Sequence, residues 1–121
     1  MEDLTISATE LCPEIILKTT GLVFISGRSM AEDASAYYKQ VHEWVQHYIE
    51  ELGSESIAVE IDLSYFNSSS AKQLLKLLMS IKNSCLSVKV NWYYPESNLI
   101  LLDRGKELSD ISELDFEYFT K

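Results

Sequence analysis

The chain has 121 residues, which is enough for one compact domain with its own core and too few for two ordinary domains. Hydrophobic residues make up 46% of it and charged residues 24%, so a globular fold is expected rather than a disordered chain. The 19 acidic residues outnumber the 10 basic ones and give a net charge of -9, which argues against a surface that binds nucleic acid through its phosphates.

The sequence also indicates where the protein resides and how many domains it has. Its first residues are acidic where a signal peptide is basic and apolar, and its longest apolar runs are only a few residues. Cys12 and Cys85 form neither a metal-ligand spacing nor a disulfide framework, so both are expected to be reduced thiols. We therefore expect a cytoplasmic protein with no membrane segment, folded as a single domain over residues 1–121.

The first part of the chain is predicted to form β-strands. A short strand is expected at Leu4–Ile6. Glu14–Lys18 and Leu22–Arg28 are apolar and rich in β-branched residues, as strands commonly are. Gly21 lies between them and adopts a positive φ at little cost, so the two segments are predicted to form a β-hairpin.

The first long helix is predicted to begin between Ser29 and Asp33 and to end at Gly53. Ser29 and Glu32 have the spacing of a capping box, and Asp33 is an alternative N-cap. Glycine commonly follows the last residue of a helix, which is the place expected for Gly53. The apolar face of this helix consists of Tyr37, Val41, Trp44, Val45, Tyr48 and Leu52.

The middle of the chain is predicted to form a strand, a loop and a helix. Ile57–Leu63 alternates apolar residues with small or charged ones, which is the pattern of a strand with one buried face. Ser64–Ser70 is polar and is expected to be a loop. The period then changes to that of an amphipathic helix over about residues 68–83. The residues on this helical spacing are Ala71, Leu74, Leu75, Leu78 and Lys82.

Two strands and one helix are predicted in the remainder of the chain. Leu86–Trp92 and Leu114–Tyr118 both show the alternation of a half-buried strand. Pro95 suits the first turn of a helix, which is expected over about residues 95–109, although Gly105 weakens its second half.

These elements predict an α/β fold in the order ββαβαβαβ, with a mixed, mostly parallel sheet and an antiparallel hairpin at one side. Parallel strands that are covered on both faces are apolar on both, whereas the strands here keep one face polar. The helices are therefore expected to lie mainly on one side of the sheet. The polar positions are Glu60, Asp62, Lys89, Asn91, Asp115 and Glu117.

The sequence contains no pattern that indicates catalysis. His42 and His47 are five residues apart, so on a helix their rings point about 140° from each other and cannot share a metal ion. The glycines form neither a dinucleotide fingerprint nor a P-loop, no serine lies in a nucleophile elbow, and no pair of carboxylates stands out. We therefore expect a protein that is not an enzyme and that binds no metal or cofactor.

The segment from Asn67 to Ser70 is the strongest candidate for a functional site, and two interpretations of it remain open. All four residues favour helix N-caps, so the simpler interpretation is a capped helix. Only one of them can be the cap, however, which leaves hydroxyl groups on the first helical turn. A phosphate on one of these would meet free backbone N–H groups and the positive end of the helix dipole, with Lys72 one turn away. The alternative is therefore a phosphorylation switch.

The segment Tyr65–Lys72, which follows Ile57–Leu63, resembles the central signature of the SiaC-like family of bacterial biofilm-regulation phosphoproteins. The resemblance extends over nearly the whole chain, as far as the acidic and aromatic C-terminus. Its other segments are Gly27–Ser29, His42–Val45, Val90–Tyr94 and Leu101–Glu107.

The resemblance implies a STAS-like fold and a phosphorylated side chain at a strand-to-helix junction, as in the STAS domains of anti-sigma-factor antagonists. In SiaC-like proteins the acceptor directly follows the asparagine, and that position is Ser68 here, where better-known members have threonine. Ser69 and Ser70 are secondary candidates for the acceptor. The residues implied to surround the phosphate or a partner are Asn67, Lys72 and Tyr65.

The resemblance further implies a partner-switching cycle. A Ser/Thr protein kinase would phosphorylate Ser68, and a PP2C-type phosphatase would remove the phosphate. The unphosphorylated form would bind and activate an effector, which is a diguanylate cyclase in the best-known system, and would thereby raise cyclic di-GMP. One alternative is an anti-sigma-factor antagonist that acts on transcription through the same switch. The other is a small enzyme or ligand-binding domain, which would need a deep pocket with convergent polar groups that we do not expect.

Overall fold

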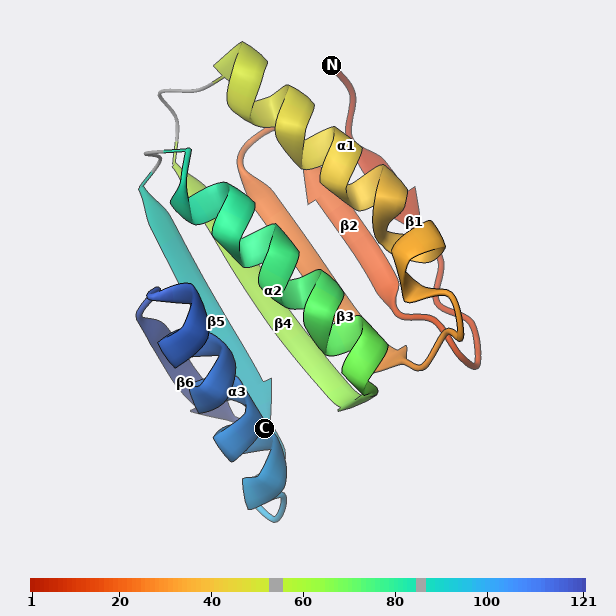
Figure 1. Ribbon diagram of the computed structural model, residues 1–121, viewed down its shortest axis with the longest axis vertical. Helices are drawn as coiled ribbons and strands as arrows, with labels where there is room; N and C mark the ends of the chain where they lie inside the picture. Colours follow the sequence, from red (N-terminus) through yellow and green to blue (C-terminus); the bar gives the residue numbers. More distant parts are fainter. Residues whose placement is uncertain (53–55, 85–86) are drawn as a thin grey trace.

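The computed structural model describes residues 1–52, 56–84 and 87–121, which form a six-stranded sheet covered by three helices (Figure 1). The strands lie side by side in chain order, from β1 to β6. Neighbours pair antiparallel from β1 to β3 and parallel from β3 to β6. The strands are β1 (Leu4–Ile6), β2 (Glu14–Lys18), β3 (Leu22–Ser29), β4 (Ile57–Phe66), β5 (Val88–Tyr94) and β6 (Phe116–Thr120).

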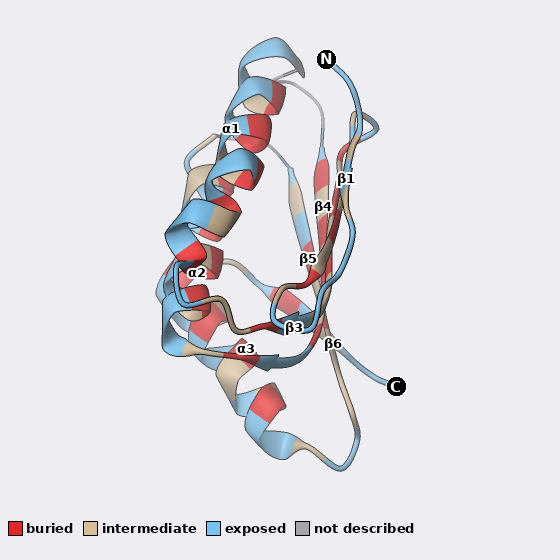
Figure 2. Ribbon diagram, turned by 90° about the vertical axis from the view of Figure 1, so that its right-hand side faces the viewer, coloured by how far each residue is buried: buried red, intermediate tan, exposed pale blue. Residues whose placement is uncertain are grey.

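All three helices pack on the same face of the sheet, and the other face is open (Figure 2). The helices are α1 (Ala34–Leu52), α2 (Ser68–Lys82) and α3 (Leu99–Ser112). The prediction of a mostly parallel sheet with helices on one side is therefore confirmed. The strand β1 confirms the short strand expected at Leu4–Ile6, which the predicted order did not include. Within the described part of the chain, none of the helices combines the length and apolar character needed to cross a membrane.

The core lies between the helices and the sheet. Alternate residues of β4 are buried against the helices, so the period-2 pattern of this strand was interpreted correctly. The core positions of α2 include Leu77 and Ile81, whereas Lys82, which shares the predicted helical spacing, is exposed. The fully buried side chains of greatest volume include Trp92, Tyr38, Tyr48 and Phe66.

Two glycines take on defined structural roles. Gly21 has φ +99° in the tight connection from β2 to β3, and its N–H donates to the carbonyl of Lys18 at 2.9 Å, which confirms the predicted hairpin. Gly105 lies inside α3, where an added Cβ would come within 2.7 Å of the Trp92 ring. Its lack of a side chain lets α3 approach the sheet closely, so this glycine serves helix packing rather than ending the helix.

The start of α1 differs from one of the two predictions made for it. Asp33 is the N-cap, because its Oδ1 accepts from the backbone N–H of Ala36 at 3.0 Å. Ser29 is the last residue of β3 and is buried, so the predicted capping box with Glu32 is wrong. Gly53, the predicted end of the helix, and Cys85 lie outside the described residues, while Cys12 is a half-buried thiol.

Other predicted boundaries are also corrected. The predicted loop Ser64–Ser70 is too long, because β4 continues to Phe66, whereas the start of α2 at Ser68 agrees with the helix predicted over about residues 68–83. The third helix begins at Leu99 rather than near Pro95, since Asn98 caps it by accepting from the Leu101 N–H at 3.2 Å. Both later strands lie about two residues further along the chain than predicted.

Candidate functional site

The strand β4 and the helix α2 meet at Asn67, which is the N-cap of the helix. Its Oδ1 accepts from the backbone N–H of Ser70 at 2.8 Å, and its own backbone is extended. Its backbone N–H donates to the carbonyl of Ser29 at 3.1 Å, and its side-chain amide reaches the carbonyl of Ala31 at 3.4 Å. Of the four polar residues considered at this junction, Asn67 therefore forms the cap and also ties the junction to the end of β3.

The three serines that follow Asn67 lie on the first turn of α2 in two different environments. Ser68 and Ser69 are exposed. Ser70 is fully buried, with an exposed fraction of 0%, and its hydroxyl donates to the carbonyl of Ser29 at 2.8 Å. The first two hydroxyls are therefore accessible from solvent, whereas the third is enclosed by the protein.

A chain of buried hydroxyl groups fastens α2 to the rest of the molecule. The Tyr38 hydroxyl and Ser29 Oγ lie 2.8 Å apart, and Ser29 Oγ donates to Ser70 Oγ at 2.7 Å. Burial raises the pKa of Tyr38 to about 12, and the hydrogen bond with Ser29 offsets this in part, so the phenol remains neutral. The chain links α1, β3 and α2 directly beneath the exposed serines. Neither Ser29 nor Tyr38 was predicted as a site residue, although Ser29 belongs to a segment that carries the family resemblance.

Arg104 brings a positive charge from α3 to the same junction. Its Nη1 donates to the carbonyl of Phe66 at 2.6 Å, and its guanidinium carbon lies 3.8 Å from the centre of the Phe66 ring. The Phe66 ring in turn packs edge-on against Trp92, with 5.7 Å between their centres. Phe66, the residue before the N-cap, is thus held by Arg104 on one side and by Trp92 on the other. Arg104 was not predicted as a site residue, although it too lies in a segment that carries the resemblance.

The outer face of α2 continues from the exposed serines as a mixed basic and apolar surface. Ser68, Lys72, Leu75 and Met79 share one side of the helix by their spacing, and Met79 is 43% exposed. A shallow hollow of about 430 Å³ lies along this helix and is lined by Lys72, Leu75, Lys76, Met79, Ser80 and Asn83. The predicted neighbour Tyr65 is 47% exposed near the end of β4. The structure thus places Lys72 on the helix that bears Ser68 and Tyr65 on the strand that leads to it.

Comparison with known proteins identifies the family. The sequence model described as SiaC family regulatory phosphoprotein matches residues 6–121. The chain belongs to the SiaC family. No curated protein matches it in sequence.

Solved structures of this family share the fold. The crystal structure of apo-SiaC from Pseudomonas aeruginosa is 24% identical over 100% of this chain and 99% of that chain, with a TM-score of 0.83. A chain in the crystal structure of the diguanylate cyclase SiaD in complex with its activator SiaC, from the same organism, is 22% identical over 98% of this chain and 100% of that chain, with a TM-score of 0.88. The family resemblance drawn from the sequence is therefore confirmed.

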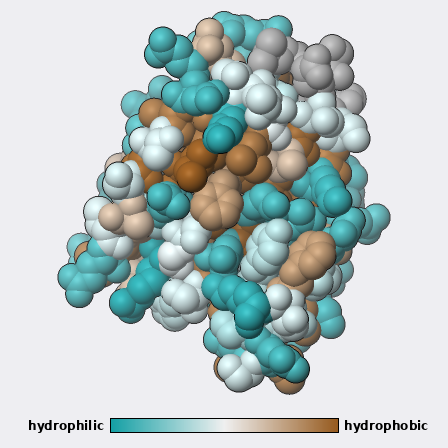
Figure 3. All heavy atoms as spheres, turned by 180° about the vertical axis from the view of Figure 1, so that it is seen from behind, coloured by the Kyte–Doolittle hydropathy of each residue, from teal (hydrophilic) through white to brown (hydrophobic). Residues whose placement is uncertain are grey.

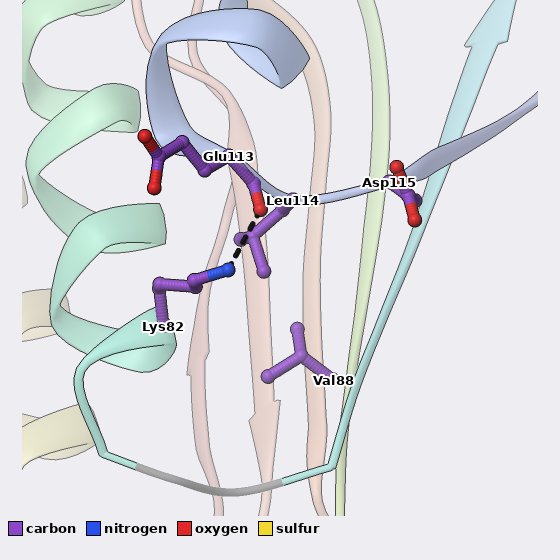
Figure 4. Close-up of a pocket in the computed structure, with 5 residues that line it drawn as sticks. All are labelled: Lys82, Val88, Glu113, Leu114 and Asp115. Carbon is purple, nitrogen blue, oxygen red and sulfur yellow. Dashed lines mark hydrogen bonds between the residues drawn. The ribbon is translucent and has the colours of Figure 1, made fainter.

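Other hollows in the described part of this SiaC-family domain lie away from the junction of β4 and α2. One of about 350 Å³ lies at the opposite end of α2 and is lined by Lys82, Val88, Glu113, Leu114 and Asp115 (Figure 4). Lys82 Nζ donates to the carbonyl of Glu113 at 2.8 Å, and the carboxylates of Glu113 and Asp115 point away from each other on either side of Leu114.

Both histidines line a hollow of about 380 Å³ between α1 and α2, together with Glu43, Glu50 and Lys76. His42 Nε2 lies 2.8 Å from Gln73 Oε1 between α1 and α2, whereas His47 is exposed. Among the described residues, no three His, Cys, Asp or Glu side chains are grouped as a metal site requires. The junction of β4 and α2 therefore remains the best candidate site.

Proposed function

We propose that this SiaC-family protein is a phosphorylation-controlled, non-enzymatic partner-switching regulator of the cytoplasm and that Ser68 is the phosphorylated residue. The observation that carries the proposal is the exposed hydroxyl of Ser68 directly after the N-cap Asn67. Burial of Ser70 argues against this serine as an acceptor. The family position after the asparagine selects Ser68 over the exposed Ser69.

A phosphate at this position would change a surface without unfolding the helix that carries it. It adds a charge of about -1.5 to -2 at neutral pH, and the first turn of a helix accommodates negative charge because its N–H groups and dipole attract anions. Lys72 lies one helical turn further and adds a cation. The phosphorylated form therefore keeps its fold and presents a strongly negative helix end.

We propose the outer face of α2 as the surface that binds the effector. Leu75 and Met79 supply apolar contacts, and Lys72 supplies a positive charge, beside the hollow on this helix. A phosphate on Ser68 at the end of this surface repels an acidic partner and has to be desolvated when the partner docks. A loss of about 1.4 kcal/mol in binding free energy lowers affinity tenfold, so a penalty of a few kcal/mol from the phosphate would release the partner.

The effector that we propose is a diguanylate cyclase, because SiaC of Pseudomonas aeruginosa is the activator of the diguanylate cyclase SiaD. The unphosphorylated form would activate this enzyme. A Ser/Thr kinase would end the activation, and a PP2C-type phosphatase would restore it.

The assignment of Ser68 is tested by incubating the protein with ATP and a Ser/Thr kinase from its native host, followed by mass spectrometry. Wild type and Ser69→Ala should gain one phosphate, whereas Ser68→Ala should gain none. If Ser68→Ala is phosphorylated, or if Ser69→Ala is the variant that gains no phosphate, another residue is the acceptor.

The effector is tested separately by capture from the native host with Ser68→Ala as bait and Ser68→Asp as its matched control. Recovery of a diguanylate cyclase by the first bait and not by the second is expected. Recovery of an anti-sigma-factor kinase instead would favour an anti-sigma-factor antagonist, which uses the same switch to act on transcription.

A further inference from the structure

The guanidinium of Arg104 has more hydrogen-bond donors than the structure uses. It presents several N–H groups in a planar fork. Within the described part of the chain, Arg104 makes one hydrogen bond, from Nη1 to the Phe66 carbonyl at 2.6 Å, and it stacks on the Phe66 ring. It forms no ion pair with any described residue, although Asp103 and Glu107 are its neighbours on α3. In a chain with a net charge of -9, this half-buried cation therefore has donors to spare.

The helix α3 holds Arg104 in a fixed position. Trp92 Nε1 donates to the Leu101 carbonyl at 3.0 Å, and the missing side chain of Gly105 lets the helix approach the Trp92 ring closely. The same ring packs edge-on against Phe66, with 5.7 Å between the ring centres. The guanidinium is therefore in place at the end of β4 before any phosphate is added there.

Ser68 lies on the side of α2 that faces α3. The two helices pack against each other and run in the same direction (Figure 1). At their C-terminal ends, Lys82 Nζ donates to the carbonyl of Glu113, which is the C-cap of α3, at 2.8 Å. Ser68 precedes Lys82 by two heptads, and an ideal helix drifts by about 20° per heptad. The two side chains therefore leave α2 on the same side, toward α3.

Arg104 also lies near the level of Ser68 along the two helices. Counted back from the contact at their C-terminal ends, two heptads reach Ser68 in α2 and Leu99 in α3. Arg104 comes little more than one turn after Leu99, and helical side chains tilt toward the N-terminus. Phe66, which the guanidinium contacts, precedes Ser68 by two residues, so their Cα atoms are at most about 7.6 Å apart. A phosphate on Ser68 therefore comes within reach of the unused N–H groups.

We propose that Arg104 binds the phosphate on Ser68 and keeps it doubly charged; this inference rests on the proposed phosphorylation of Ser68. Nη1 keeps its bond to the Phe66 carbonyl, and the other N–H groups donate to phosphate oxygens, for which the guanidinium fork is well shaped. A neighbouring cation favours the dianion, so the pKa of the second phosphate ionisation falls below its ordinary value of about 6. The charge that releases a partner then persists at mildly acidic pH.

Two other cations near the junction are held less firmly than Arg104. Lys72, one turn after Ser68, and Arg28, near the end of β3, are both exposed. Ion pairs of exposed side chains contribute little, because water screens them and both side chains lose freedom. Of the three cations, Arg104 alone is fixed by a hydrogen bond within the described structure. The face of the sheet without helices, with its apolar patch beside polar side chains (Figure 3), is on the other side of the strands.

The test uses the full-length protein with phosphoserine incorporated at position 68 during synthesis, so that no kinase is needed. A pH titration followed by ³¹P NMR measures the pKa of the phosphate. Arg104→Gln should raise this pKa by about one pH unit, because an opposite charge at close range shifts a pKa by about 1–3 units. Arg104→Lys, which keeps the charge without the fork, should give an intermediate value. In the protein with Arg104 in place, its Nε–H resonance should shift on phosphorylation.

Two matched controls separate a specific contact from a general effect of charge. Lys106→Gln removes the same charge at an exposed position of α3 that points away from Arg104, and it should leave the phosphate pKa unchanged. Phosphoserine at position 69 replaces an exposed serine about 100° around the helix from Ser68, and its pKa should not respond to Arg104→Gln. Circular dichroism at the temperature of the titration establishes that each protein is folded.

Four outcomes would overturn the role of Arg104. They are an equal phosphate pKa in the Arg104→Gln variant and its parent, an equal change in Lys106→Gln, the same response at position 69, and an Arg104 resonance that phosphorylation leaves in place. These results are independent of the kinase assay. Modification of another residue by the kinase would refute the assignment of Ser68, whereas a phosphate pKa that ignores Arg104 would refute the contact proposed here.

Discussion

A negative charge at Ser68 and a negative charge at Ser70 should have opposite effects on stability, although the two residues share one helical turn. Ser68→Asp places its carboxylate in solvent at the N-terminus of α2, where an anion contributes about 0.3–1 kcal/mol through the helix dipole. We expect this variant to unfold within a few degrees of wild type, because about 1 kcal/mol corresponds to about 3–5 °C in a domain of this size.

Ser70→Asp replaces a buried hydroxyl, which both donates to the Ser29 carbonyl and accepts from Ser29 Oγ, with a carboxylate that can only accept. The Ser70 hydroxyl donates to the carbonyl of Ser29 at 2.8 Å, so a carboxylate there would face another acceptor with no solvent to screen it. An uncompensated buried charge costs about 3–5 kcal/mol, and the melting temperature should fall by more than about 10 °C.

Thermal and urea unfolding followed by circular dichroism measure both variants, with Ser70→Ala as the control for loss of the hydroxyl alone. That control should lose about 1–2 kcal/mol, because it leaves the Ser29 hydroxyl with Tyr38 as its remaining partner. Destabilisation of Ser68→Asp to the level of Ser70→Asp would refute the reasoning and would favour a purely structural role for Ser68. A stable Ser70→Asp would show that this serine is not enclosed as described.

Three further predictions concern the packing around the junction. Gly105→Ala should destabilise the protein by about 1–3 kcal/mol in urea unfolding, because its Cβ would meet the Trp92 ring at 2.7 Å, and a gain in stability would contradict the close approach of α3. Arg104→Lys should lose about 1–2 kcal/mol, since an ammonium cannot both stack on the Phe66 ring and bond its carbonyl as the guanidinium does; thermal stability equal to wild type would refute this. Burial lowers the pKa of His42 below its usual 6.5, with a partial offset from the hydrogen bond to its glutamine partner. The His42 imidazole of the unfolded chain therefore takes up a proton more readily than that of the folded protein. The contribution of neutral His42 to the free energy of unfolding is present above pH 6.5 and is lost as the pH falls through the lower folded pKa. Urea unfolding should show that the free energy of unfolding decreases between pH 7 and pH 5, and His42→Gln should reduce this decrease. An equal decrease in His42→Gln would exclude His42 as its source.

The sequence predicted the layers of the fold better than the ends of its elements. The alternation of Ile57–Leu63 correctly gave a strand with one polar face, because burial on one side imposes a period of two. The same rule failed at the end of this strand. The register between β3 and β4 shifts at Gly27 and Arg28, where Leu63 and Tyr65 are successive partners and Ser64 is the extra residue. A bulge interrupts the period, so the last residues of β4 had the appearance of a loop.

The site was predicted only where its determinants are local. Asn67 as a candidate cap and exposed hydroxyls on the first turn follow from neighbouring residues alone. The partner that buries Ser70 is Ser29, 41 residues earlier, and the partner of the Phe66 carbonyl is Arg104, 38 residues later. No periodicity in the chain specifies contacts over such distances, because they arise from the pairing of β3 with β4 and from the packing of α3 on the sheet.

The arrangement at the junction explains how one helix end can be both fixed and modifiable. The Asn67 cap, the Ser70 hydroxyl and the Arg104 guanidinium hold the backbone on either side of Ser68. None of these contacts uses the Ser68 side chain, so a phosphate there breaks no bond that maintains the fold. A switch at Ser68 would therefore act through the charge that α2 presents to a partner, and a change in the shape of the domain is not needed to release that partner.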